Sequence, residues 1–178
     1  VMLMHCVSKY PCPPEDLNLE TITFLREKYD IPVGFSDHSL GHKEAWAAVG
    51  LGAVAIEKHL SLSRDLWGAD HKVSLTPPEF KALVEGIRSK KNPEMAARGR
   101  KMKILHEDER ALRGIFRKSL VCARFLKAGE KITKDALYAM RPQASIHGLS
   151  SDHYEEVLGK TIKKSLKKYA SITPEALE

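Results

Sequence analysis

The first half of the chain alternates short apolar runs with segments of helical character. The apolar runs have the length of buried strands, and they cover residues 2–7, 31–36 and 53–59. Periodicity, alanine content and start signals predict helices at residues 16–29, 44–51 and 76–89. Thr76 and Glu79 form the pattern of a capping box at the start of the last helix. A strand followed by a helix, repeated three times, predicts parallel strands with crossover helices.

Three such units cannot close a barrel, and they form a poor sheet by themselves. The chain also begins inside a strand, without a preceding turn or cap. We therefore interpret residues 1–90 as the last three βα units of an α/β fold, a (β/α)8 TIM barrel whose N-terminal half is absent from the sequence. A doubly wound sheet is the competing architecture, but no glycine-rich phosphate loop supports it.

The second half of the chain has a different pattern. Residues 91–116 are polar and highly charged, and we interpret them as a helix or linker between two modules. Beyond them, LKAGEKITKDAL at 126–137 returns as LKKYASITPEAL at 166–177. Each copy predicts a strand end, a turn and a short helix opened by a threonine. Such a duplication indicates a small, pseudo-symmetric β-rich domain at residues 117–178.

Composition and charge narrow the class of protein. With 43% hydrophobic and 29% charged residues, the chain has the composition of a soluble globular protein. Three cysteines without CxxC pairing fit reduced thiols in a cytoplasm. Residues 91–178 carry most of the positive charge, but acidic residues are interspersed and no aromatic platform accompanies it. We therefore expect neither nucleic acid nor a membrane as partner, and attraction of anionic substrates is the alternative use of this charge.

Polar side chains end the second and third expected strands, which close on Ser36-Asp37-His38 and Glu57-Lys58-His59. Because neighbours on a strand point to opposite faces, Ser36 and His38 share a face and cannot form a triad with Asp37. Glu57 and His59 share a face for the same reason. Barrel active sites lie at the carboxyl ends of the strands, and adjacent strands are about 4.8 Å apart. The two imidazoles could therefore meet at one metal ion.

Two histidine ligands leave coordination positions open, as a catalytic metal requires. Mixed nitrogen and oxygen ligation suits Mn²⁺, Zn²⁺ or Fe²⁺. The alternative is that His38 and His59 are satisfied polar residues at the rim of the barrel, because their spacing alone is no metal motif.

Two loops carry further polar candidates. Asp70 follows the third strand and could accept a substrate hydroxyl, and His71 is a further candidate ligand. The alternative for this segment is a plain surface loop closed by Gly68. After the first strand, Ser8 and Tyr10 point in roughly one direction, and their alternative role is packing and turn formation.

Six segments in this order and spacing resemble the sialic acid synthase (N-acetylneuraminate synthase) family: LMHCVSKYPCPPEDLNL, GFSDHSLG, AIEKHLSL, LWGADHKVSL, RKSLVCARFLKAGEKIT and AMRP. The resemblance extends over nearly the whole chain, and its last part resembles the SAF (antifreeze-like) domain. It implies the end of a TIM barrel, a linker and a SAF domain. It also implies a metal-dependent condensation of phosphoenolpyruvate with N-acetylmannosamine or its 6-phosphate, which yields N-acetylneuraminate or its 9-phosphate and phosphate.

Position by position, the resemblance implies specific roles. His38 and His59 match ligands of a divalent metal, Mn²⁺ with Mg²⁺ as the alternative. Glu57 and Asp70 match catalytic carboxylates beside the metal and the sugar. The substrate-binding positions that it implies are Ser36 for phosphoenolpyruvate, Ser8 and Tyr10 for the sugar, and Arg141, which the SAF domain of a partner subunit lays over the N-acyl group.

The resemblance further implies a domain-swapped homodimer. Legionaminic and pseudaminic acid synthases share the machinery with other sugars, and a non-catalytic, sugar-binding SAF fragment or a generic metal-dependent hydrolase are the remaining alternatives. The basic residues that hold phosphoenolpyruvate in the family lie mainly upstream, so we expect this chain alone to be inactive.

Three features depart from the family pattern. Ser8 stands where an asparagine is usual, and residues 143–145 replace a glycine-rich turn. Tyr169 occupies the turn position that Gly129 has in the first repeat, and tyrosine is poorly suited to positive φ. We therefore expect the loop of the second repeat to differ from that of the first.

Overall fold

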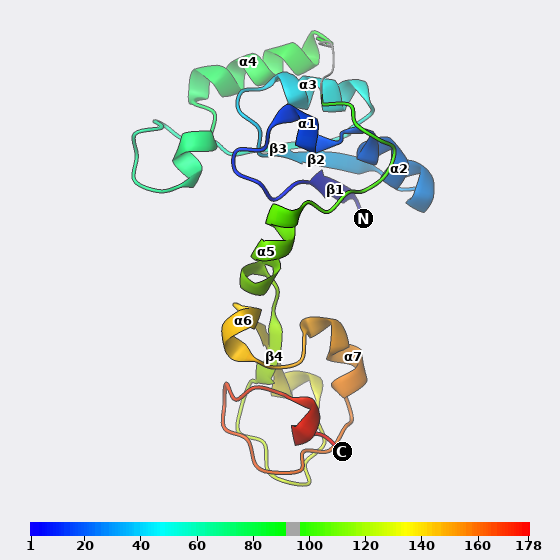
Figure 1. The fold of residues 1–178 in the computed structure, drawn as a ribbon, viewed down its shortest axis with the longest axis vertical. Helices are drawn as coiled ribbons and strands as arrows, with labels where there is room; N and C mark the ends of the chain where they lie inside the picture. Colours follow the sequence, from blue (N-terminus) through cyan, green and yellow to red (C-terminus); the bar gives the residue numbers. More distant parts are fainter. Residues whose placement is uncertain (92–96) are drawn as a thin grey trace. The chain divides into compact units, whose positions relative to one another are not determined.

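The computed structural model describes residues 1–91 and 97–178 (Figure 1). Its contacts divide the chain into two compact units, Val1–Glu109 and Arg110–Glu178. Residues 92–96, which belong to the expected linker, lie outside the described residues. In the described part of the chain the three cysteines are free, and no helix has the length and apolar character needed to cross a membrane.

The first unit contains a parallel sheet in the order β1-β2-β3, formed by Leu3–Cys6, Val33–Asp37 and Ile56–Lys58. Cys6 is opposite Ser36, and Ser36 is opposite Glu57, so the carboxyl ends of the three strands lie together. The strands are shorter than the apolar runs that predict them, but their parallel pairing agrees with the sequence.

A further parallel bridge joins Leu60 to Leu75, where the Leu75 amide donates to the His59 carbonyl at 2.8 Å. Helix α4 (Pro77–Arg88) therefore follows a fourth β position and not β3 directly. The sequence does not reveal this bridge, because its partners are single residues at the two ends of a polar loop. The capping box of α4 is confirmed: the Thr76 amide and hydroxyl both donate to Glu79 at 2.8 Å.

The expected helix at residues 16–29 is wrong at its start. It is divided into α1 (Pro14–Leu17) and α2 (Glu20–Tyr29) by Asn18, whose φ is 49°. The Asn18 side-chain amide donates to the Thr21 hydroxyl at 2.9 Å and to the Met102 carbonyl. Asparagine tolerates the left-handed region better than most residues, and this partner 84 positions away holds it there.

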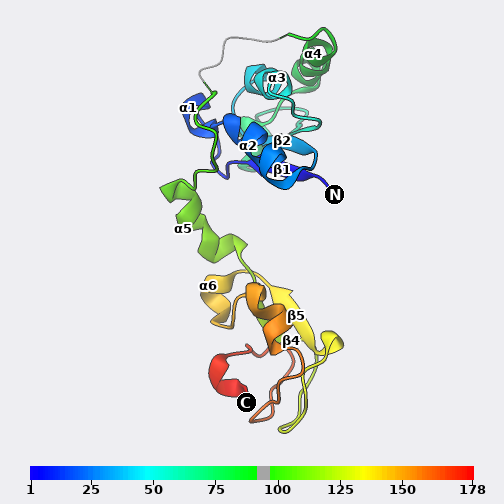
Figure 2. The ribbon, with the colours of Figure 1, turned by 90° about the vertical axis from the view of Figure 1, so that its right-hand side faces the viewer.

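Helices cover the sheet and complete the core of the first unit. Helix α3 (Lys43–Gly50) packs against α4, and Figure 2 shows the two side by side. Phe35 from β2 and Ile22 from α2 are fully buried in one cluster. Each fully buried aliphatic or aromatic side chain contributes about 1.5–3 kcal/mol, so this packing holds β2 firmly in place.

The described part of the linker is not a free connection. Residues 97–106 run along the first unit, where the Leu19 amide donates to the Ala97 carbonyl at 2.9 Å and the Glu20 amide to the Arg98 carbonyl at 2.8 Å. The Arg98 guanidinium also donates to the Glu20 carboxylate at 2.5 Å. Helix α5 (Glu107–Phe116) follows, and the boundary between the two units falls within it.

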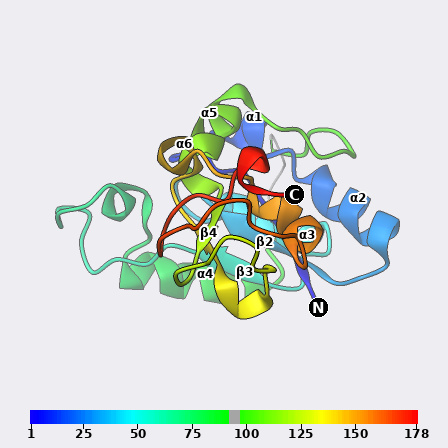
Figure 3. The same ribbon diagram turned by 90° about the horizontal axis from the view of Figure 1, so that it is seen from below.

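The second unit is a small β-rich fold built on the repeat. Strands β4 (Ser119–Cys122) and β5 (Leu137–Met140) are antiparallel, and two short helices, α6 (Gln143–Ile146) and α7 (Tyr154–Val157), follow. The two copies pair through antiparallel bridges such as Leu126–Leu166. Val157 of α7 and Leu177 near the C-terminus share its buried cluster, and Figure 3 shows the C-terminal turn near α7.

The expected short helix of each copy is a 3-10 turn, Lys134–Ala136 and Pro174–Ala176, opened by a threonine as expected. The expectation that the second loop differs is wrong. Gly129 has φ 81° and Tyr169 has φ 68°, so both copies make the same left-handed turn. The Tyr169 amide donates to the Cys122 carbonyl at 2.8 Å, and this pairing holds the tyrosine in a conformation that costs about 1–2 kcal/mol.

Candidate active site

The carboxyl ends of β2 and β3 carry matched polar pairs on both faces of the sheet. On one face the Ser36 hydroxyl donates to Glu57 at 2.6 Å. One position further along, the imidazole rings of His38 and His59 lie edge to face, with centroids 5.4 Å apart. The alternation and the meeting of the two imidazoles, both expected from the sequence, are present in the structure.

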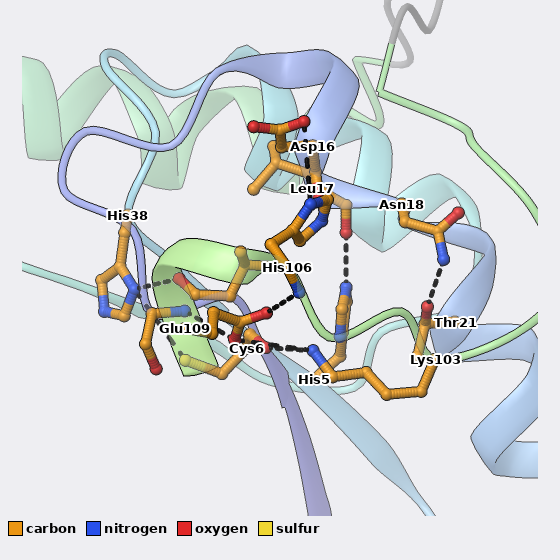
Figure 4. A network of polar contacts seen from close by, with 12 residues as sticks. His5, Cys6, Asp16, Leu17, Asn18, Thr21, His38, Lys103, His106 and Glu109 are labelled. Carbon is orange, nitrogen blue, oxygen red and sulfur yellow. Dashed lines mark hydrogen bonds and ion pairs between the residues drawn. The ribbon is translucent and has the colours of Figure 1, made fainter. Parts of the chain in front are cut away.

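His38 is held in one tautomer. Its Nδ1 lies 2.8 Å from the Val7 carbonyl oxygen, and a carbonyl can only accept, so Nδ1 carries the proton. The neutral ring then has its lone pair on Nε2. The side chain is buried, and Cys6 Sγ lies 3.8 Å from the same Nδ1 (Figure 4). A carbonyl that accepts the proton of one ring nitrogen is a common partner of metal-binding histidines and fixes the direction of the ring.

Tyr10 joins the two histidines. Its ring centroid lies 4.1 Å from that of His38 and 6.0 Å from that of His59. Burial raises the pKa of the Tyr10 phenol, so the hydroxyl remains protonated near neutral pH. A half-exposed phenol above paired imidazoles can offer a hydrogen bond to a bound polar molecule.

The loop after β3 places the carboxylate of Asp70 near His59, whereas it directs the ring of His71 to another partner. Asp70 Oδ2 lies 3.9 Å from His59 Nδ1, and the Asp70 side chain is 70% exposed. His71 is engaged differently, because its Nδ1 lies 2.8 Å from the Ser61 hydroxyl. Residues 70–73 form a 3-10 turn, so the adjacent side chains of Asp70 and His71 face different partners.

A buried ion pair supports the site from the opposite face. Lys58 Nζ lies 2.8 Å from Asp37 Oδ2, and both side chains are almost completely buried. Lys58 also donates to the Ser39 carbonyl at 2.5 Å, and the Ser39 hydroxyl donates to Asp37 at 2.7 Å. We did not expect this pair from the sequence, although the same alternation that joins Ser36 to Glu57 predicts that Asp37 and Lys58 meet.

Two further predicted substrate residues have partners of their own in the structure. Ser8 follows β1, and its backbone amide donates to Glu109 at 3.1 Å. Arg141 belongs to the second unit, directly after β5, where its guanidinium lies 5.8 Å from the centre of the Phe116 ring. Glu109 was not expected from the sequence either, and its signal there is its place three residues after His106, as in a capping box.

The donor set fits a divalent metal held by two protein ligands. The unprotonated Nε2 of His38 and the imidazole of His59 are nitrogen donors, and Glu57 and Asp70 supply carboxylates nearby. Among residues 1–91 and 97–178, no cluster of three or more His, Cys, Asp or Glu has the geometry of a metal cage. Two neighbouring imidazoles with open positions around them would suit a catalytic metal, which keeps a place for water or substrate, better than a closed structural one.

Comparison with known proteins agrees with the fold. The chain is 38% identical to the N,N'-diacetyllegionaminic acid synthase of Campylobacter jejuni over 94% of its length and 48% of the relative. It is 31% identical to the N-acetylneuraminate-9-phosphate synthase of Drosophila melanogaster over 92% of its length and 49% of the relative. The chain thus spans about half the length of these curated relatives.

A solved structure matches as well. The spore coat polysaccharide biosynthesis protein spsE of Bacillus subtilis superposes with a TM-score of 0.78 at 30% identity, covering 99% of this chain and 53% of that one. The NeuB family model matches residues 1–99, and the SAF domain model matches residues 117–178. The chain, part of a TIM barrel followed by a SAF domain, therefore belongs to the NeuB family.

Proposed function

We propose that the full-length protein containing this chain condenses phosphoenolpyruvate with an N-acylated amino sugar, such as N-acetylmannosamine or its 6-phosphate. The observation that carries the proposal is the meeting of His38 and His59 at adjacent strand ends, with the carboxylates of Glu57 and Asp70 beside them. The names of the relatives support the class of reaction, since they are synthases of acidic sugars of this kind.

His38 and His59 would hold the divalent metal, which we expect to be Mn²⁺ rather than Mg²⁺ because imidazole is a softer ligand than Mg²⁺ prefers. When bound, such a cation polarises a carbonyl oxygen as a Lewis acid. The protein's contribution is the orientation of the two rings, and His38 is already fixed by its bond to the Val7 carbonyl.

The proposed reaction balances with one water. C3 of phosphoenolpyruvate forms a bond to the aldehyde carbon of the open-chain sugar, and the aldehyde oxygen gains a proton. Water adds to C2, and the bond from C2 to the phosphate oxygen then breaks and releases phosphate. Glu57, fixed by the Ser36 hydroxyl at 2.6 Å, is suited to orient this water and take its proton. Asp70, on its exposed loop, is suited to accept a hydrogen bond from a sugar hydroxyl.

The remaining substrate roles follow the same assignment. Ser36 contacts the phosphate of phosphoenolpyruvate, and Tyr10, above the two imidazoles, contacts the sugar together with Ser8. Arg141 binds the N-acyl group across a homodimer, from the SAF domain of the partner subunit. The resemblance to sialic acid synthases supports this role of Arg141. The guanidinium of arginine carries five N–H donors in a planar arrangement, which suits a carbonyl or carboxylate.

Phosphate release by the full-length protein tests the proposal. We expect release from phosphoenolpyruvate only when a divalent metal and an amino sugar are both present, with Mn²⁺ more effective than Mg²⁺ and with loss of activity in EDTA. N-acetylmannosamine, its 6-phosphate and a diacetamido sugar, compared in parallel, distinguish the family's substrate classes. Phosphate release that needs no metal would overturn the proposal. So would the absence of phosphate release with all of these sugars.

A further inference from the structure

The peptide group between Val7 and Ser8 is bonded on both sides. Its carbonyl accepts the proton of His38 Nδ1 at 2.8 Å, and its amide donates to Glu109 Oε1 at 3.1 Å. The bond is not among the cis peptides of the chain, so the two groups point in opposite directions. Because a peptide unit is planar and stiff, the carboxylate that fixes its amide also fixes the direction of its carbonyl.

Glu109 is itself fixed. Its side chain is 8% exposed, and its second oxygen, Oε2, accepts the His106 amide at 3.1 Å. Lys103 Nζ lies 4.0 Å from Oε1 and balances part of the buried negative charge. A buried carboxylate with both oxygens bonded is rigid, because losing either bond would leave a desolvated group without a partner.

Neighbouring contacts hold the start of α5 and the segment before it against β1, α1 and the loop between them. His106 Nε2 lies 2.9 Å from the Asp16 carbonyl, and Lys103 donates to the Cys6 carbonyl at 2.8 Å. Lys9 lies 2.8 Å from the Asp16 carboxylate and 3.1 Å from that of Asp108. Figure 4 shows Glu109, His106 and Lys103 gathered around the end of β1, close to His38.

We propose that Glu109 is a positioning residue for His38 and acts through the Val7–Ser8 peptide. The proposal rests on the proposed function, because it matters only if His38 binds the metal. The carboxylate polarises the peptide, and hydrogen bonds in such a chain strengthen one another. A stronger bond from Nδ1 to the carbonyl fixes the ring and makes Nε2 a better donor, as partners of metal-binding histidines do.

A simple helix cap is the competing explanation of Glu109. A cap needs one acceptor for the amide at the helix start, and Oε2 supplies it for His106. The bond from Oε1 to the Ser8 amide is additional, since Ser8 is 101 positions away in the chain. Only the positioning role predicts that loss of this bond changes metal affinity.

The Glu109→Gln variant of the full-length protein separates the two explanations. Glutamine has the same shape but one acceptor oxygen, so it cannot accept from both Ser8 and His106. We expect Mn²⁺ to bind about tenfold more weakly in titrations of the free ion, the range found for partners of ligating histidines. Phosphate release at saturating Mn²⁺ should change much less than the Mn²⁺ concentration needed for half activity.

Glu20→Gln is the matched control. Glu20 is also a carboxylate that bonds the 97–106 segment, through Arg98, but it lies on α2 and not on α5. It should leave Mn²⁺ affinity unchanged. If Glu109→Gln fails to fold, Glu109→Asp keeps the charge and the cap with a shorter reach, and we expect a several-fold weaker affinity.

The outcomes separate the inference from the proposed function. A folded Glu109 variant that binds Mn²⁺ as tightly as the unmodified protein, while His38→Ala binds it weakly, would overturn the positioning role alone. If neither the unmodified protein nor any variant binds Mn²⁺, the proposed function fails, and the inference fails with it.

Discussion

Individual histidines of this chain differ in burial and in hydrogen bonding, and these differences set what each ring can do. His5 lies in the core of the first unit with 1% exposure, and its Nε2 lies 2.7 Å from the Leu17 carbonyl. Its Nδ1 has no hydrogen-bond partner among the described residues. Burial lowers the pKa of His5 to about 4, so the ring is neutral at physiological pH. His38, which follows β2, also has one bonded nitrogen, but its ring packs against that of His59.

The lowered pKa of His5 predicts that the fold loses stability in acid. The folded protein binds its proton at about pH 4 and the unfolded chain at about pH 6.5, so the unfolded state holds more protons between these values. The free energy of unfolding should therefore fall as the pH drops through this window, by roughly 2–3 kcal/mol from this residue. Denaturation of the full-length protein at pH 7 and pH 4.5 measures the change.

The control for this prediction is His5→Gln, whose amide can still bond the Leu17 carbonyl but does not titrate. Carboxylates with lowered pKa, such as Asp16, weaken the fold in acid in both proteins and cancel in the comparison. An equal loss of stability in the two proteins would show that His5 does not contribute.

At the scale of elements, β2 and β3 are joined at their carboxyl ends by side chains on both faces. Ser36 and Glu57 bond on the site face, and Asp37 and Lys58 form the buried ion pair on the other. The ion pair therefore fixes the strand ends that carry the two histidines. Because burial costs both charges their hydration, a pair of this kind adds little net stability, although breaking it is costly.

The Asp37–Lys58 pair yields a second prediction. Lys58→Met leaves a buried carboxylate without its partner, so we expect the free energy of unfolding to fall by about 3–5 kcal/mol. The double variant Asp37→Leu, Lys58→Met removes both charges and should recover most of this loss. Denaturant unfolding of the full-length proteins measures both, and a single variant as stable as the parent would refute the buried-pair account.

The sequence predicts elements well where the signal is local. Alternation along β2 and β3 predicts which residues share a face, and the Thr76–Glu79 capping box marks the start of α4 correctly. The break at Asn18 is missed, because it depends on Met102, far along the chain. The turn at Tyr169 is mispredicted for the same reason, since intrinsic preference is overridden by pairing with Cys122.

At the scale of the whole molecule, the order of patterns predicts a barrel portion followed by a small duplicated domain, and the comparisons agree. The meeting of His38 and His59 was predictable, because strand alternation and parallel register determine it. The contact of Glu109 with Ser8 was not, because it joins a polar segment to a distant loop and leaves no periodic pattern. The sequence pattern thus does not reveal contacts between irregular segments that lie far apart in the chain.

We propose that His38 and His59 together hold one divalent metal. Titration of Mn²⁺ into the full-length protein, followed by electron paramagnetic resonance of the free ion, measures this binding. We expect one site per subunit, with affinity reduced by more than about 100-fold in both His38→Ala and His59→Ala. The His71→Ala variant should bind as the parent does, because His71 is engaged by Ser61. Undiminished Mn²⁺ affinity in either of the first two variants would show that the two histidines do not hold the metal together.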